Sequence, residues 1–460
     1  MAGLVSDRRA LFQRGDILGH GFLQRFKCIS EDSVFFYGRE GEPVPPFACK
    51  FSPSGLHGNL LVTADEDGSI KLLNSQKPAQ HSLIKEWKGH KNAIFDFAFS
   101  GSTHLVTGSG DSKLVQWDIN DCTALRRFKG HTGSVKSVDI DESNPCVVVS
   151  GGRGGNILIW DTRCSSSKDG FTVPISKVPN AHLDNSEIKL SNSSSRRKSI
   201  VSMKQVAVTS VLFHRDHYVA SSGAADSCIK LWDVRGRTTT PTPSHTFMYG
   251  SHGITSLLSD PYQSLLYAAS TDNKIYVYDS VTLKNVPIDV FTGHKNQSYY
   301  IKTALSVCGR FLLSGSTHKN AVIWDTQKPR SPPTLLVGHD TEVTAVAWCP
   351  SQLDKIVTCS DSCDLRIWRT NEVKERGREE VIGYAERSTE KQEPPVLRPI
   401  ENTSIGNDAI RSGATTPDKV LIKKRKNSVT SPEMKSKKIK VNKDTTPLSQ
   451  RTINSFFNKS

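Results

Sequence analysis

Four Gly-His pairs divide most of this 460-residue chain into units of similar length. They stand at Gly89-His90, Gly130-His131, Gly293-His294 and Gly338-His339. The first two pairs, and likewise the last two, are separated by about 40 to 45 residues, a spacing typical of stacked repeats. Between the pairs, apolar and polar residues alternate in short runs, which is the two-residue period of half-buried β-strands. The pattern predicts a ring of β-sheets, one sheet for each repeat.

The ends of the alternating runs repeat as well. A Trp-Asp pair, or a weaker form of it, closes six of them: Trp117-Asp118, Trp160-Asp161, Trp232-Asp233, Tyr278-Asp279, Trp324-Asp325 and Trp368-Arg369. An early Gly-His and a late Trp-Asp mark the WD40 repeat, in which four strands form one blade. The sequence therefore predicts an all-β protein, a seven-bladed WD40 β-propeller over residues 41–370.

Three further segments lie outside this repeat. Residues 1–40 contain one run, Phe22 to Cys28, that we expect to close the ring as an extra strand of the last blade. Residues 164–205, after the third blade, are rich in Ser, Lys and Arg and are expected to form a disordered insertion. Residues 371–460 show no sustained periodicity and are predicted to be a disordered basic tail.

The positive charge of the chain is concentrated in that tail. Of the formal net charge of +14, most belongs to the last fifty residues, which hold 13 Lys and Arg against 3 Asp and Glu. The run Lys423, Lys424, Arg425 and Lys426 is interpreted as a nuclear import signal, and we expect a nuclear protein. Non-specific contact with DNA phosphates and a merely solvated run remain open as alternatives.

Two Ser/Thr-Pro pairs lie close to the basic runs. Thr416-Pro417 and Ser431-Pro432 resemble sites of cyclin-dependent kinases. A phosphate at either site would offset the adjacent positive charge. Unused Ser/Thr-Pro pairs in a disordered tail are the alternative.

The repeated histidines are predicted to be structural. A His, a turn Asp and a strand Trp are expected to form a buried polar chain, because covered polar groups need hydrogen-bond partners. Two blades have the full set: His90 with Asp111 and Trp117, and His339 with Asp361 and Trp368. In the third blade, Gly154 stands where the Asp is expected.

No motif for catalysis, metal binding or membrane insertion is present in the sequence. It has no phosphate-binding loop, no nucleophile elbow and no Cys-x-x-Cys pair, and its ten cysteines are scattered. It has no apolar run of about eighteen residues and no signal peptide after Met1. We therefore predict a non-catalytic intracellular protein without cofactor, metal or membrane segment.

Two neighbouring blades end with an additional arginine. These endings are Trp160-Asp161-Thr162-Arg163 and Trp232-Asp233-Val234-Arg235, which share the pattern WDxR. An Arg just past the third strand projects from the bottom rim, where its five donors can bind carbonyl or carboxylate groups of a partner. An Arg that is solvated, or paired within the chain, is the alternative.

The WDxR pair resembles the motif by which WD40 substrate receptors dock on the adaptor of cullin-4 RING ubiquitin ligases, the large subunit of the damage-specific DNA-binding protein. Other stretches resemble the denticleless family of such receptors: Pro43 to Phe47, Gly151-Gly152-Arg153, Ile159 to Cys164, Lys168 to Phe171, Gly293 to Asn296, and Tyr300 to Lys302. A basic insertion after the third blade is also typical of that family, whereas Gly154 and the shorter tail depart from it.

A second motif lies at the end of the tail. Gln450, Ile453, Phe456 and Phe457 have the spacing of the PIP box, which binds the sliding clamp PCNA. The three apolar residues can share one face of a short helical turn and fill an apolar pocket, while Gln450 occupies a polar slot beside it. Asn454 and Ser455 differ from the Thr-Asp of boxes that mark substrates for destruction, so we interpret the motif as a docking box.

Substrates are expected to bind the top face, opposite the WDxR rim. Lys136, Arg153 and Lys302 are predicted to lie there and to form a basic mouth, although lysines on loops are usually only solvated.

The resemblance implies a substrate receptor of a nuclear cullin-4 RING E3 ubiquitin ligase. Its expected partners are the adaptor, the ligase, PCNA, and PCNA-bound substrates such as a replication-licensing factor. A protein of another class remains open: a WD40 chromatin- or histone-binding scaffold whose tail contacts DNA and whose PIP-like ending is incidental.

Overall fold

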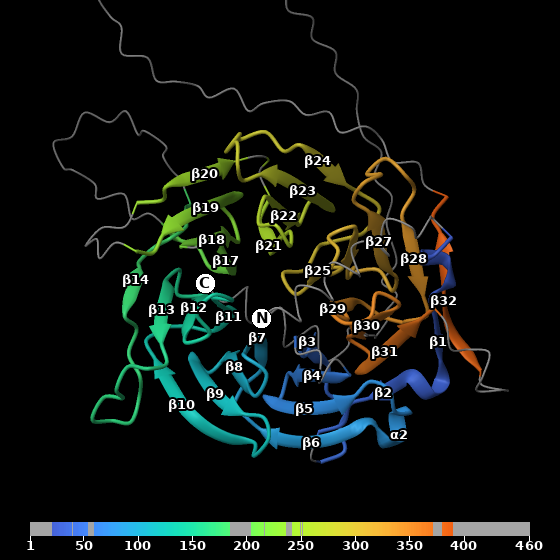
Figure 1. Cartoon of the computed structure of the whole chain (residues 1–460), viewed down its shortest axis with the longest axis horizontal. Coiled ribbons are helices and arrows are strands. Elements are labelled where there is room, and N and C mark those ends of the chain that lie inside the picture. Colours follow the sequence, from blue (N-terminus) through green and yellow to red (C-terminus); the bar gives the residue numbers. More distant parts are fainter. Residues whose placement is uncertain are drawn as a thin grey trace, which may run out of the picture. The chain divides into compact units, whose positions relative to one another are not determined.

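A computed structural model of the chain describes residues 21–38, 40–53, 59–184, 204–215, 217–235, 242–248, 250, 252–370 and 380–389. These residues lie in one compact unit, residues 1–399. In this unit, β-sheets surround a central channel like the blades of a propeller (Figure 1). The predicted all-β WD40 propeller is confirmed, and the described residues contain one short α-helix, α2 (Ala79–Ser82).

Five of the blades are separate four-stranded antiparallel sheets whose strands follow one another from the channel outward. In chain order they are β3 (Pro46–Phe51), β4 (Leu60–Asp65), β5 (Ser69–Asn74) and β6 (Leu83–Lys88) in blade 1; β7 (Ile94–Ser100), β8 (His104–Ser109), β9 (Lys113–Asp118) and β10 (Thr123–Lys129) in blade 2; β11 (Val135–Ile140), β12 (Val147–Gly152), β13 (Ile157–Asp161) and β14 (Ser176–Val178) in blade 3; β17 (Val208–His214), β18 (Tyr218–Gly223), β19 (Cys228–Asp233) and β20 (His245–Met248) in blade 4; and β21 (Ile254–Ser259), β22 (Leu265–Ser270), β23 (Lys274–Asp279) and β24 (Asp289–Phe291) in blade 5.

The hydrophobic core lies between adjacent blades. Every residue of β29 (Val343–Trp348) and β30 (Lys355–Ser360) is buried, whereas most of the outer strand β6 is exposed. Trp117 of blade 2, for example, packs with Ile70 of blade 1 and with Phe97 of its own blade. Both faces of an inner strand are therefore covered, and each blade depends on its neighbours for its core.

The last two blades are joined in one ten-stranded sheet. Blade 6 contains β25 (Thr303–Leu305), β26 (Phe311–Ser314), β27 (Ala321–Asp325) and β28 (Thr334–Val337), and blade 7 contains β29, β30 and β31 (Asp364–Arg369). The outer position of blade 7 is taken by two N-terminal strands, β1 (Lys27–Ile29) and β2 (Ser33–Phe35), which both pair with β31.

The N-terminal segment thus closes the ring, but not with all the residues expected. Leu23–Arg25 forms a 3-10 turn, η1, and a second turn, η2 (Ser30–Asp32), separates β1 from β2. The buried guanidinium of Arg369 donates hydrogen bonds to both carboxylate oxygens of Asp32, at 3.1 and 3.2 Å. This ion pair holds the turn against the last blade.

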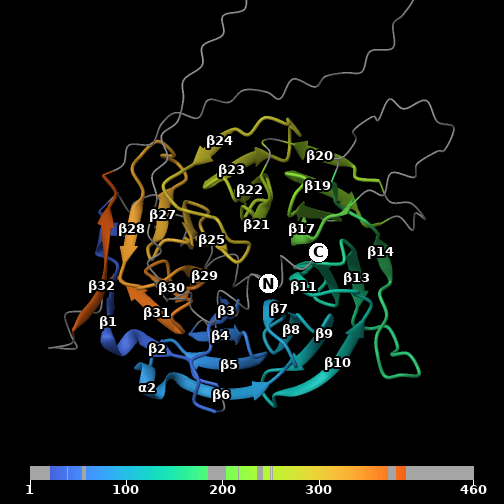
Figure 2. The same cartoon turned by 180° about the vertical axis from the view of Figure 1, so that it is seen from behind.

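A strand also lies in the range that we predicted to be disordered after residue 370. β32 (Val381–Arg387) pairs with β28 of blade 6 on one side and with β1 on the other, and both views show it at the outer edge of the ring (Figures 1 and 2). Gly383 lies against Trp368, where a Cβ would come within 2.7 Å of the indole ring. The sequence of this segment shows only a weak strand pattern. The segment is ordered by pairing with the edges of β1 and β28, which only the tertiary structure provides.

We expect a chain that ends at Thr370 to be less stable than the full-length chain. The truncation removes the strand between β1 and β28, together with the packing of Ile382 and Ala385 on the core. The lost burial and hydrogen bonds should lower the free energy of unfolding by about 2 kcal/mol. Urea denaturation followed by tryptophan fluorescence measures this difference. A chain ending at Thr389 is the control and should match the full-length chain; equal midpoints for all three would contradict the role of β32.

The predicted polar chain is present in blade 2 with one additional member. His90 Nδ1 lies 3.0 Å from a carboxylate oxygen of Asp111, and its Nε2 lies 2.8 Å from the hydroxyl of Thr107. The indole N–H of Trp117 donates to the same hydroxyl at 3.0 Å. The chain ties the connection between blades 1 and 2 to two strands of blade 2, which is a structural role.

In blade 7, the aspartate in this chain is not the one predicted. His339 Nδ1 lies 3.1 Å from Asp364, and Nε2 lies 2.6 Å from Thr358, which also accepts from Trp368 at 2.8 Å. The prediction of Asp361 was therefore wrong. The turn between β30 and β31 has the same length as that of blade 2, but Ser362 occupies the position of Asp111, and the carboxylate reaches the imidazole from the first residue of β31.

Blade 3 lacks the aspartate, as its sequence indicates. His131 and Trp160 both bind the hydroxyl of Ser150, at 2.7 and 2.8 Å, and Gly154 leaves His131 Nδ1 without a hydrogen-bond partner among the described residues. Burial lowers the pKa of His131 to about 4, so this imidazole is neutral at physiological pH.

Blade 4 has a complete chain whose histidine the sequence did not reveal. His182 lies 2.6 Å from Asp226 and 2.8 Å from Ser221, and Trp232 donates to Ser221 at 2.8 Å. His182 lies within the 164–205 segment that we expected to be disordered. Part of that segment is ordered, since it also contains β14 and both strands of the small sheet formed by β15 (Leu183–Asp184) and β16 (Lys204–Gln205).

Candidate protein-interaction surfaces

The aspartate of each WDxR motif forms a turn at the end of the third strand. Asp161 Oδ1 accepts a hydrogen bond from the backbone N–H of Arg163 at 2.8 Å, and Asp233 Oδ1 accepts one from Arg235 at 3.0 Å. These short side-chain-to-backbone bonds fix the direction of the chain as it leaves β13 and β19. Trp160 and Trp232 are buried in the polar chains described above.

Each arginine side chain folds back onto the same carboxylate. In Arg163, Nε donates to Asp161 Oδ1 at 2.9 Å and Nη2 donates to Oδ2 at 2.7 Å. Arg235 and Asp233 repeat this arrangement. The bidentate bonds lower the pKa of both carboxyl groups, that of Asp233 to about 2, so both pairs are charged at neutral pH.

The paired arginines nevertheless remain available to a partner. Both side chains are 62% exposed. The Asp occupies only the Nε and Nη2 edge of each guanidinium, and Nη1 has no protein partner in the described ranges of the chain. Intramolecular pairing therefore fixes the side chain while one edge stays free to donate, which reduces the entropy lost on binding.

Other blades have the same turn without the arginine. Asp118 accepts from the backbone of Asn120 at 2.7 Å, Asp325 from Gln327 at 3.1 Å, and Asp279 from Val281 at 2.8 Å. The Asp turn is thus part of the propeller framework, and the arginine at its third position is an addition specific to blades 3 and 4. These blades are neighbours, since Ser137 of β11 bonds to Val211 of β17.

The three residues predicted to form a basic mouth on the top face do not form an exposed basic surface. Lys136 is buried, and its Nζ lies 3.4 Å from the centre of the Phe95 ring. Burial, with Lys302 and Arg153 nearby, lowers the pKa of Lys136 well below its usual value. Lys302 lines the central cavity, and Arg153 is half-buried in the turn between β12 and β13.

An aromatic cluster that the sequence did not reveal surrounds Lys136. The rings of Phe47 and Phe95 stack with centres 5.8 Å apart, and the ring centre of Tyr300 lies 5.5 Å from that of Phe47. Phe47, Phe95 and Lys136 each occupy the position where the register of the innermost strand shifts by one residue. Such bulges redirect a side chain, so these residues from blades 1 to 3 meet at one end of the channel.

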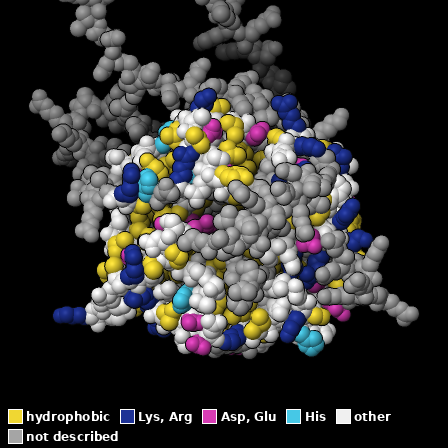
Figure 3. Space-filling view, in the orientation of Figure 1, with side chains coloured by type: hydrophobic (Ala, Val, Ile, Leu, Met, Phe, Trp, Pro, Cys, Tyr) yellow, Lys and Arg dark blue, Asp and Glu magenta, His cyan; other side chains and the backbone are white. Residues whose placement is uncertain are grey.

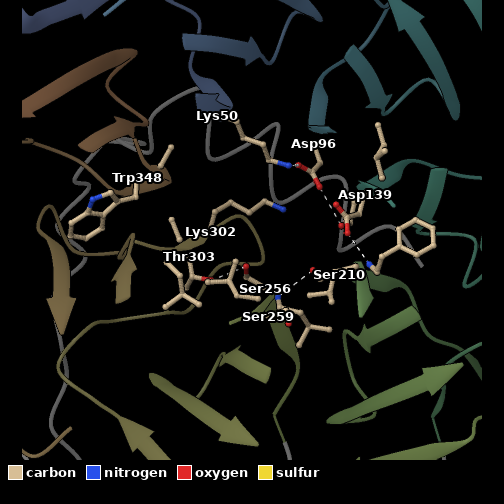
Figure 4. A pocket seen from close by; sticks show the side chains of 18 of the residues that line it. Lys50, Asp96, Asp139, Ser210, Ser256, Ser259, Lys302, Thr303 and Trp348 are labelled. Atoms are coloured by element: carbon tan, nitrogen blue, oxygen red, sulfur yellow. Dashed lines mark hydrogen bonds and ion pairs between the residues drawn. The ribbon is translucent and has the colours of Figure 1, made fainter. Parts of the chain in front are cut away.

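A cavity of about 780 Å³ occupies the channel and is lined by the inner strands of all seven blades. Figure 4 shows the charged side chains of Lys50, Asp96, Asp139 and Lys302 directed into it. Lys50 Nζ lies 2.9 Å from Asp96, and Asp139 accepts the backbone N–H of Phe213 at 2.8 Å. These bonds join the free inner edges of neighbouring blades. Among the described residues, no group of three His, Cys, Asp or Glu side chains could hold a metal ion.

Comparison with known proteins agrees with this architecture. The model of the family "WD domain, G-beta repeat" matches six segments: residues 81–118, 122–161, 198–233, 241–279, 285–325 and 330–369. Together they cover half of the chain. The chain belongs to the WD40 repeat family. Most matched segments of this WD40 protein begin at or before the outer strand of one blade and end with the third strand of the next, so the repeats interlock around the ring.

Within the family, this WD40 protein is similar to the denticleless proteins. It is 40% identical over 385 residues to "Denticleless protein homolog" of Homo sapiens, a match that covers 80% of this chain and 52% of the relative. The homologue of Gallus gallus is 39% identical over 363 residues, covering 75% and 50%. "Protein lethal(2)denticleless" of Drosophila melanogaster is 34% identical over 371 residues, covering 75% and 48%. The chain thus spans about half the length of these relatives.

The remaining predicted sites of this WD40 protein lie outside the described residues. They are the basic run Lys423, Lys424, Arg425 and Lys426, the sites Thr416 and Ser431, and the PIP-like Gln450, Ile453, Phe456 and Phe457. In the part of the chain that is described, no helix has the length and hydropathy needed to cross a bilayer. Lys and Arg side chains are spread around the face shown in Figure 3, mixed with other residue types.

We expect the substitution Asp139→Asn to stabilise the propeller at neutral pH. Burial raises the pKa of Asp139 from 3.8 to about 6, so the folded state holds the proton more tightly than the unfolded chain. Ionisation above pH 6 therefore costs the folded state stability, and this cost disappears as the pH falls from 6 towards 4. The side-chain oxygen of Asn can still accept the hydrogen bond from the backbone N–H of Phe213. The substitution should therefore raise the free energy of unfolding by about 2 kcal/mol at pH 7.5.

Urea denaturation at pH 7.5 and at pH 4 measures this effect. At pH 4, the gain in the free energy of unfolding should be only a small part of the gain at pH 7.5. Glu142→Gln, on the exposed turn after β11, is the control and should alter neither value. A loss of stability at pH 7.5 would show that the charged form of Asp139 supports the fold.

Proposed function

We propose that this protein is a substrate receptor of a nuclear cullin-4 RING E3 ubiquitin ligase. Its WDxR edge, defined as Arg163 and Arg235 with their turns, would dock on the adaptor, the large subunit of the damage-specific DNA-binding protein. The observation that carries the proposal is the pair of adjacent, identically held arginines, each 62% exposed, at turns that do not need them. Two fixed guanidinium edges on one rim suit an interface that offers carbonyl or carboxylate acceptors.

The protein would act as a non-catalytic recognition subunit. The polar chains that contain its buried histidines tie strands together, and the described residues offer no metal cluster. Its contribution would be to hold substrate and ligase in one complex, as in other WD40 binding platforms.

The tail would bring the receptor to PCNA. Gln450, Ile453, Phe456 and Phe457 have the spacing of a clamp-docking box. When the tail is bound to the clamp, binding of a substrate on the same clamp by the propeller becomes intramolecular, and its effective concentration rises. Substrates would then be proteins bound to PCNA, such as a replication-licensing factor.

Affinity purification of the full-length chain from dividing cells tests this proposal. We expect the adaptor, cullin-4 and PCNA to be recovered together. Recovery of histones without adaptor and cullin would instead support a chromatin-binding scaffold and would overturn the receptor proposal.

A further inference from the structure

The bottom rim of blade 5 exposes an unusual amount of apolar side chain. Two loops contribute, the connection between β21 and β22 and the connection between β23 and β24. Their exposed side chains, which we call the blade 5 rim, are Tyr262 (73% exposed), Val281 (58%), Leu283 (40%), Val286 (37%) and Ile288 (47%). The second loop follows the third strand of its blade, as the WDxR turns do, so the rim lies at the same end of the propeller, one blade beyond Arg235.

Leu283 is held in a conformation that is unfavourable for leucine. Its φ angle is +54°, in the left-handed region that glycine and asparagine adopt more readily. The turn is fixed because Asp279 accepts backbone hydrogen bonds from Val281 at 2.8 Å and from Thr282 at 3.1 Å, and the Leu283 N–H donates to the Asp279 carbonyl at 3.2 Å. A strained, exposed leucine on a rigid turn indicates a binding role rather than a folding role.

The turn that presents Tyr262 is equally rigid. The buried carboxylate of Asp260 accepts the backbone N–H of Ser264 at 2.6 Å, of Leu265 at 2.7 Å and of Tyr262 at 3.2 Å. The backbone at Tyr262 is therefore fixed, and a rigid turn presents its side chain to solvent. Rigid aromatic side chains are frequent anchors of protein interfaces, since little entropy is lost when they bind.

A pocket of about 380 Å³ adjoins the rim, between blades 5 and 6. Tyr262 and Ile288 line both the rim and the pocket, and Phe291 and Tyr267 add further aromatic surface. A pocket of this size beside exposed apolar residues can receive a side chain of a partner, which is the usual geometry of an interface hot spot.

The surroundings of the rim are positively charged. Exposed Lys and Arg residues on the loops of blades 4 to 6 include Arg215, Arg235, Lys284, Lys328 and Arg330, while Asp289, which lines the pocket, has Arg330 nearby. Arg215 also links the two blades, since its Nε donates to the carbonyl of Gln263, beside Tyr262, at 3.2 Å. The carboxylates of Asp260 and Asp279 accept hydrogen bonds from backbone N–H groups of their own turns. The surface therefore suits an apolar segment flanked by acidic residues.

We propose that the blade 5 rim and its pocket extend the WDxR edge and bind an apolar, acid-flanked segment of the same adaptor. This inference rests on the proposed function, because it assigns the rim to the partner of Arg163 and Arg235. The arginines contribute directed hydrogen bonds, and the rim contributes the apolar contact that an interface of charged pairs alone would lack.

The substitution Leu283→Gly gives the sharpest test, because folding and binding should respond in opposite directions. Glycine relieves the positive φ angle, so the melting temperature should be equal to or higher than that of the full-length wild-type chain. Binding of the purified adaptor, measured by biolayer interferometry, should become five- to tenfold weaker, and Tyr262→Ser should weaken it about tenfold. Leu83→Ser, at a residue 51% exposed on the outer strand of blade 1, is the control and should bind like wild type.

The outcomes separate the rim from the proposed function. If Arg163→Ala with Arg235→Ala weakens binding but the rim variants bind like wild type, the inference about the rim is overturned and the receptor proposal stands. If the wild-type chain does not bind the adaptor, both are overturned. If the rim variants change self-association in light scattering while adaptor binding is unaltered, the rim is a contact between copies of this chain and the inference is again overturned.

Discussion

Replacing both Arg163 and Arg235 by alanine is expected to weaken binding to the adaptor about a hundredfold and to leave the propeller folded. Both side chains lie at the surface, and their backbone turns are held by Asp161 and Asp233 through bonds that do not involve the guanidinium. The substitutions therefore remove two fixed donor edges without disturbing the framework. Arginines held in this way are frequent hot spots of interfaces, and two of them on one rim should account for much of the affinity.

Titration of the purified full-length variants with the adaptor measures this effect. The matched control is Asn120→Ala, since this residue occupies the same turn position in blade 2. The control should bind like wild type, and circular dichroism should be unchanged in both variants. Undiminished binding by the arginine variant would mean that the Arg-Asp pairs are only local ion pairs, which contribute little at an exposed surface.

A peptide of residues 445–460 is expected to bind PCNA, and replacing both Phe456 and Phe457 by alanine should reduce its affinity by a hundredfold or more. The two rings and Ile453 are spaced to share one face of a single helical turn, where they would fill an apolar pocket as one anchor. Truncating two aromatic anchors removes most of the buried apolar area of such a short peptide.

Isothermal titration calorimetry of the peptide against PCNA measures this affinity. Thr452→Ala with Asn454→Ala is the control, because the motif places these residues between its anchor positions; the affinity should change less than threefold. Binding that is indifferent to both phenylalanines, or no binding at all, would remove the clamp from the proposed mechanism while leaving the adaptor contact to be judged by Arg163 and Arg235.

The blade pattern could be predicted from the sequence because it depends on local repetition. The alternation of apolar residues and the Trp-Asp endings follow from the period of a strand and from the turn after it. The prediction failed where distant segments complete the structure. β32 has few strongly apolar residues and is ordered by the edges of β1 and β28. His182 joins blade 4 from within the inserted segment, through Asp226 and Ser221.

The site residues could be predicted where they depend on a local pattern, and not where they depend on contacts between distant segments. Arg163 and Arg235 lie at a fixed distance from a local marker, so the sequence places them on the rim that the structure shows. Lys136 looked equally suitable for a surface role, but the bulge in β11 directs it onto Phe95, a residue of another blade. Asp361 lies in the turn, where a carboxylate was expected, but the aspartate that reaches His339 is Asp364 at the start of β31, and the repeat period does not distinguish between the two.

The sequence by itself determined the β-propeller repeat, the position of its turns and the addition of an arginine to two of them, since each of these depends on residues close together in the chain. Only the tertiary structure decided which strands close the ring, which carboxylate pairs with which histidine, and that five apolar side chains gather beside the WDxR edge. These features depend on contacts between segments that are far apart in the chain, where no local pattern records which groups will meet or how much of each remains exposed.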